Sequence, residues 1–99
     1  MTRWSKRASA DLRAIGRFIA RRSRKASEAW IERLVLRAED ASVIPLAARV
    51  VPEFARTDVR EVFLRSYRIV YRVDDGGFFV LTVFEGHRLM LKIDPDAVT

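Results

Sequence analysis

The sequence predicts an α+β fold in which an N-terminal helical hairpin packs on a small antiparallel β-sheet, in the order βααβββ. The first half of the chain repeats apolar residues at helical spacing, and the second half alternates apolar and polar residues at strand spacing. Turn signals separate the alternating stretches. With 99 residues the chain can build one modest core, so we expect residues 1–99 to form a single domain.

A short leading strand, "RWS", is expected before a first helix that runs from about Ala8 to Arg22. Ser9 and Asp11 suit the first turn of this helix, as a cap and as a partner of the helix dipole. The apolar stripe of the helix, spaced i, i+3 and i+7, consists of Leu12, Ile15 and Ile19.

A second helix is expected after the interruption "SRKAS" (Ser23–Ser27) and ends at about Ser42. Its core face is formed by Ile31, Leu34, Ala38 and Ala41. Two antiparallel helices joined by a short turn have a shared apolar side, which must be buried against a sheet or a partner.

Three strands follow a proline-bounded loop over residues 45–58. They are expected at residues 59–64, 67–73 and 78–85, with turns at "RS" and at "DDGG". Aspartate and glycines between two alternating stretches are typical of a β-hairpin, so the strands should form an antiparallel meander.

Strand alternation places Tyr67, Ile69, Tyr71 and Val73 on the face that packs on the helices, and Arg68 and Arg72 on the opposite face. There Arg68 is expected in a patch with Phe63, Leu81 and Val83, either free to hold an anion or paired across strands with Glu61 or Glu85.

Positive charge is concentrated at the start of the chain. The net charge is +6, but residues 1–25 contain nine Lys and Arg side chains and a single acidic one, which gives +8. Arg13, Arg17, Arg21 and Arg24 form a basic stripe along the first helix. Such a surface either binds an anionic partner, which could be nucleic acid or an acidic protein, or is simply solvated.

The composition excludes several classes of protein. The absence of cysteine excludes a disulfide framework and cysteine-based zinc sites, and no apolar run approaches the length of a membrane span. The first residues lack the apolar core of a signal peptide, so a cytoplasmic location is expected. No metal site or cofactor site is predicted.

Four segments together resemble the RelE/ParE superfamily of toxins from bacterial type II toxin–antitoxin systems. They are "WSKRASADLRAIGRFIARRS", "ARVVPEF", "VREVFLRSYRIVYRV" and "VFEGHRLM". The resemblance implies a cognate antitoxin that wraps and neutralises this chain. The motif "DVREV" is more similar to the ParE-like branch, which poisons DNA gyrase without catalysing a reaction, so that function is favoured.

The first alternative is a RelE-like, ribosome-dependent mRNA endoribonuclease. Its site would use Arg68, Arg88 and His87, with Glu61 as a possible base. Two lysines expected of that branch fall at Val59 and Glu61, and no tyrosine follows Arg88. The second alternative is a decayed, non-toxic module that retains only its antitoxin interface.

Binding residues can be proposed for each partner. Antitoxin contacts are expected at Phe18, Trp30, Val35 and Arg68, although Trp30 and Val35 could equally be core residues. Contacts with the target, either gyrase or the ribosome with its mRNA, are expected at Arg13, Arg17, Arg21 and Arg88. Direct DNA binding is not assigned to this chain, and no membrane partner is expected.

Overall fold

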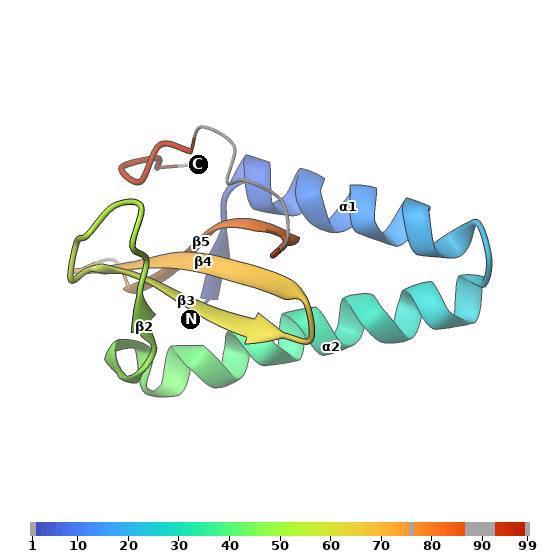
Figure 1. The fold of residues 1–99 in the computed structure, drawn as a ribbon, viewed down its shortest axis with the longest axis horizontal. Coiled ribbons are helices and arrows are strands. Elements are labelled where there is room, and N and C mark those ends of the chain that lie inside the picture. The colour runs from blue at the N-terminus through green and yellow to red at the C-terminus, as the bar shows by residue number, and fades with distance from the viewer. Residues whose placement is uncertain (1, 76, 87–92, 99) are drawn as a thin grey trace.

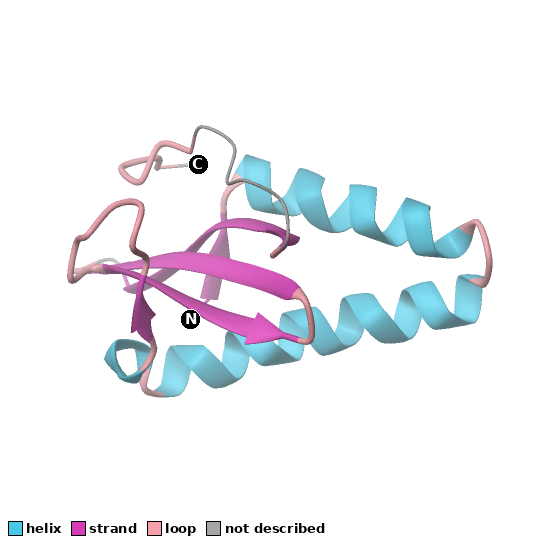
Figure 2. Cartoon of the chain, in the orientation of Figure 1, coloured by secondary structure: helices cyan, strands magenta, loops and turns pink. Residues whose placement is uncertain are grey.

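The computed structural model describes residues 2–75, 77–86 and 93–98, and it forms a helical hairpin packed on one face of a five-stranded sheet (Figure 1). The elements are β1 (Thr2–Trp4), α1 (Lys6–Ala20), α2 (Arg24–Val43), a 3₁₀ turn η1 (Pro45–Ala47), β2 (Arg49–Val50), β3 (Val59–Leu64), β4 (Tyr67–Asp74) and β5 (Gly77–Glu85). The turn between the two helices extends well beyond the sheet (Figure 2).

The expected α+β fold is confirmed, but the sheet is mixed rather than purely antiparallel. Its strand order is β1-β5-β4-β3-β2, and the leading strand β1 pairs in parallel with the first part of β5, with Trp4 opposite Val80. Strand β2 lies within the expected loop over residues 45–58 and pairs with β3. Two residues are too few for an alternating pattern, which is why the sequence did not reveal β2.

Helix α1 begins earlier than expected. Its N-cap is Ser5, whose hydroxyl accepts a hydrogen bond from the Ala8 amide at 2.9 Å, so the cap expected at Ser9 was wrong. Asp11 is not a dipole partner either, because its carboxylate reaches across to β5 and accepts a hydrogen bond from the Val83 amide at 3.1 Å. Helix α2 begins after a much shorter break than expected, with Ser23 as its N-cap.

The main core lies between the hairpin and the sheet. The predicted core residues Leu34, Ala38 and Ala41 of α2 are buried there against Ile69 and Tyr71 of β4. Alternation along β4 therefore placed its inner face correctly.

A β-bulge in β5 changes which side of the sheet its following side chains face. Val70 is opposite Thr82 and Tyr71 is opposite Val80, so Leu81 is left without a partner in the ladder. Beyond the bulge the alternation is shifted by one, and Val83 packs in the main core instead of near Arg68. The patch expected around Arg68 was wrong in this respect.

Candidate functional site

Arg68 lies at the centre of a cluster of ion pairs on the outer face of the sheet. Its Nε donates a hydrogen bond to Glu61 Oε1 at 2.8 Å, and its Nη2 also contacts that oxygen. Nη1 and Nη2 reach the carboxylate of Glu53 at 3.2 and 3.3 Å. The ring of Phe84 lies 5.1 Å from the guanidinium carbon. The cross-strand pair with Glu61, one of the alternatives for Arg68, is therefore present.

Glu61 is held by cations on two sides. It is 2 % exposed, and Arg49 Nε lies 3.1 Å from its second carboxylate oxygen. A carboxylate with so little solvent contact must be paired to remain charged. Glu61, the residue proposed as a possible base, is thus a buried carboxylate between Arg68 and Arg49.

Charge pairing in this cluster is reflected in two pKa shifts. Hydrogen bonding from Arg68 is the main cause that lowers the pKa of Glu53 below its ordinary value. Burial on its own would lower the pKa of Arg68, but the hydrogen bonds to Glu53 and Glu61 outweigh burial and raise it. The guanidinium is therefore permanently charged, and all three of its nitrogens already bind carboxylates.

The outer face of the sheet is covered by other segments of the same chain. Val51 and Phe54, after β2, and Ile93 and Ala97, near the C-terminus, pack on an apolar cluster formed by Val59, Val70, Phe79 and Leu81. Long-range packing of the two segments, which the alternating pattern of the strands did not indicate, covers this face.

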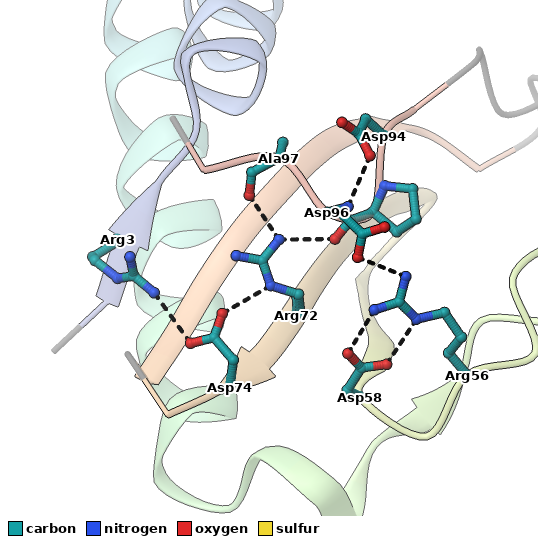
Figure 3. Close-up of polar contacts among 9 residues, drawn as sticks. Arg3, Arg56, Asp58, Arg72, Asp74, Asp94, Asp96 and Ala97 are labelled. Carbon is teal, nitrogen blue, oxygen red and sulfur yellow. Dashed lines mark hydrogen bonds and ion pairs between the residues drawn. The ribbon is translucent and has the colours of Figure 1, made fainter.

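Two arginines hold residues 93–98 in this position (Figure 3). Arg72 donates from Nη1 to the carbonyl oxygens of Pro95 and Ala97 at 2.8 and 2.7 Å, and from Nε to Asp74 at 2.9 Å. Arg56 bridges Asp58 and Asp96. Hydrogen bonding from Arg56 lowers the pKa of Asp58 below its ordinary value. We call residues 93–98, held in this way, the C-terminal strap.

The residues expected to bind antitoxin do not form one surface. Trp30 packs edge-on against Tyr67, with ring centroids 5.9 Å apart, and the guanidinium of Arg33 lies over the Trp30 ring, 4.7 Å from its centroid. Phe18 is 67 % exposed. Val35 lies in a different place, in a groove between α1 and α2. Arg68 lies on the far side of the sheet from all of these.

The groove between the helices brings together residues that were assigned to different partners. Leu12, Ile31 and Val35 contribute apolar surface, and Arg13 and Arg17 contribute positive charge. The helices approach closely here, because the hydroxyl of Ser27 donates to the Gly16 carbonyl at 2.7 Å. We call this feature the hairpin groove.

The remaining predicted site residues fall elsewhere. Arg21 is exposed at the end of α1, with its guanidinium 6.0 Å from the ring of Phe18. His87 and Arg88 lie outside the described residues. Within the described ranges no group of three or more potential metal ligands is found. No helix of the described chain is long and apolar enough to cross a membrane.

Sequence reasoning missed Arg49, Glu53 and Arg56. The spacing of Arg56 and Asp58 could have indicated a local ion pair, because both occur in one turn-rich segment. Nothing in the sequence indicates that Glu53 reaches Arg68, since that contact depends on how the loop folds over the sheet.

This chain is similar to known proteins in fold and in sequence. A solved structure described as the chromosomal ParDE TA system from P. aeruginosa matches with a TM-score of 0.70, covering 85% of this chain and 92% of that chain. The two sequences are 17% identical, so the likeness establishes the fold. The comparison with curated proteins found no match. The model of the family "ParE toxin of type II toxin-antitoxin system, parDE" matches residues 2–90. With nearly the whole chain matched in sequence and the fold shared, this protein belongs to the ParE toxin family of type II toxin–antitoxin systems.

Proposed function

We propose that this ParE-type toxin arrests bacterial growth by poisoning DNA gyrase in the cytoplasm, and that it does so by binding rather than by catalysis. The observation that supports binding over catalysis is that all three guanidinium nitrogens of Arg68 donate hydrogen bonds to the carboxylates of Glu53 and Glu61. Membership of the ParE family supports gyrase as the target.

Ribonuclease chemistry would need cations that are free to stabilise a phosphorane. In this chain Glu61 and Glu53 add negative charge beside Arg68, which repels a phosphate by Coulomb's law. The C-terminal strap and the segment after β2 also cover the outer face of the sheet. Both features favour a role for this face in stability.

We further propose that the cognate antitoxin inserts an acidic amphipathic helix into the hairpin groove. Leu12, Ile31 and Val35 would bury the apolar stripe of such a helix, and Arg13 and Arg17 would pair with its acidic side. The exposed Phe18 and half-buried Trp30 would then contact flanking parts of the antitoxin.

A supercoiling assay tests the proposed target. Purified gyrase, plasmid, ATP and this toxin freed of its antitoxin are incubated, then treated with detergent and protease. We expect linear plasmid, released from trapped cleavage complexes, in proportion to the toxin concentration. Normal supercoiling at a large excess of toxin would refute the proposal, and cleavage of mRNA in a translating extract would then identify the ribonuclease alternative.

A pair of variants tests the antitoxin surface. Val35→Asp places a charge in the apolar groove and should weaken antitoxin binding at least tenfold, while growth arrest persists. The matched control is Leu36→Asp, an exposed residue of the same helix that does not line the groove. Equal antitoxin affinity for both variants would contradict the placement. Expression of the wild-type chain without growth arrest would instead indicate a decayed module.

A further inference from the structure

Two groups of arginine and lysine side chains contrast in how they are paired. Other basic residues belong to neither group, for example Arg7, which pairs with Asp11, and Arg13 and Arg17, which are exposed on α1. On the sheet and its loops, Arg3, Arg49, Arg56, Arg68 and Arg72 each pair with a carboxylate. At the turn of the helical hairpin, Arg21, Arg22, Arg24 and Lys25 are exposed, and none of them pairs with a carboxylate of any described residue. We call these four residues the hairpin tip.

Folding does not explain the charges of the hairpin tip. Arg24 and Lys25 occupy the first turn of α2, which contains no acidic residue. The positive end of the helix dipole makes cations unfavourable at this position. Four like charges within five residues also repel one another. Residues that break local rules without a compensating contact are typical of functional surfaces.

The position and the residue types of the hairpin tip restrict what it can bind. The tip is the end of the hairpin that extends beyond the sheet, opposite the strap and the segment after β2 (Figure 1). Three of its four residues are arginines, whose planar guanidinium matches phosphate oxygens in a two-point contact. Protein interfaces also use arginine, but they place it around an apolar buried core that is depleted of lysine.

We propose that the hairpin tip binds the phosphate backbone of duplex DNA. This inference rests on the proposed function, because a gyrase poison acts where gyrase holds DNA. The hairpin groove and the hairpin tip meet at Arg24, which lines the groove. The groove would bind a protein segment, and the other residues of the tip would contact phosphates. Binding at the tip is independent of DNA sequence and falls steeply with salt.

The test is fluorescence anisotropy with a labelled duplex of mixed sequence and the toxin freed of antitoxin, measured over a salt series. The tip variant is Arg22→Gln/Lys25→Gln, and the charge-matched control is Arg33→Gln/Arg37→Gln on α2. Each phosphate contact contributes about 0.9 to the slope of log K against log salt, so we expect the slope of the tip variant to fall by about 1.8. The control should keep the slope of the wild-type protein.

Folding is checked by urea unfolding of each variant. The tip variant should be at least as stable as the wild-type protein, because its side chains make no described ion pair. Equal slopes for the tip and control variants would overturn the inference, as would a wild-type protein that does not bind the duplex at all. Tighter binding of a polyglutamate peptide of equal charge would also overturn it, and would assign the tip to an acidic protein.

The supercoiling assay separates the two proposals. If the toxin traps gyrase but the tip variant binds the duplex normally, the tip inference fails and the proposed function stands. If the tip binds the duplex as predicted but gyrase is unaffected, DNA binding by the tip stands and the choice of target is wrong.

Discussion

Replacing Arg68 with methionine should destabilise the protein strongly while revealing nothing catalytic. The substitution leaves Glu61, which is 2 % exposed, with Arg49 as its remaining cation at 3.1 Å. Removing one partner of a buried ion pair typically costs about 3–5 kcal/mol. Because Arg49 still compensates part of the charge, we expect about 3 kcal/mol, which lowers Tm by roughly 12 °C or more in a domain of this size.

A double-mutant cycle tests whether Arg68 is a structural ion-pair partner of Glu61 or a residue that contacts the target. Glu61→Met alone leaves Arg68 beside the exposed Glu53, so it should cost less than Arg68→Met. Arg68→Met/Glu61→Met removes both buried charges and should recover most of the lost stability, since well-packed apolar residues often replace a buried pair at little cost.

The assays are urea unfolding for stability and plasmid linearisation for gyrase poisoning. We expect the free energy of unfolding to rank Arg68→Met lowest, Glu61→Met next and the double variant nearest to the wild-type protein. The double variant should still trap gyrase. Undiminished stability of Arg68→Met together with loss of function in every variant would refute this reasoning, because it would make Arg68 a contact residue.

Three further predictions concern backbone contacts and pH. Gly86→Ala should destabilise the protein by more than about 1 kcal/mol, because a Cβ there would lie 2.7 Å from a carbonyl of the β3–β4 turn. A Cβ at Gly16 would make only ordinary contacts, so Gly16→Ala should be neutral or stabilise α1 by up to about 1 kcal/mol. Urea unfolding of the two variants measures the contrast. Asp11→Ala should lower the free energy of unfolding by about 1–3 kcal/mol, because it leaves the Val83 amide without its hydrogen-bond acceptor. Amide hydrogen exchange at Val83 should then accelerate. Unchanged exchange would contradict the role of Asp11 at the edge of β5. The pKa of Asp58 is lower in the folded protein than in the unfolded chain. The Asp58 carboxylate therefore stabilises the fold above the unfolded pKa of about 3.9, and this stabilisation is lost as the pH falls from there through the folded pKa. Asp58→Asn should thus lose less stability in acid than the wild-type protein.

Much of the architecture follows from local pattern. Helical spacing identified both helices, and alternation identified β3 with its exact bounds and the inner face of β4. These features depend on neighbours a few residues apart, so a single sequence contains enough information to predict them. The motifs that resemble the RelE/ParE toxins extend along the same segments that the family model matches.

The candidate site was less predictable, because long-range contacts define it. Alternation placed Arg68 opposite Glu61, but it could not show that Glu53 folds over the sheet to share the guanidinium. The position of Arg13, Arg17 and Val35 in one groove depends on how two helices cross, which neither helix specifies alone.

By itself the sequence determined the α+β fold, the family and the concentration of positive charge in its first 25 residues. The tertiary structure alone decided which positive charges along the chain are neutralised. Arg68 is neutralised because the fold brings Glu53 and Glu61 to it from other segments. Arg72 pairs with Asp74 of its own strand and donates to carbonyl groups of the C-terminal strap. The hairpin tip is not neutralised, because the hairpin extends beyond the sheet and its loops, where the carboxylates that pair with those arginines lie (Figure 1). Glu28 lies one turn away on α2, and among the described residues the structure shows no ion pair between it and the tip.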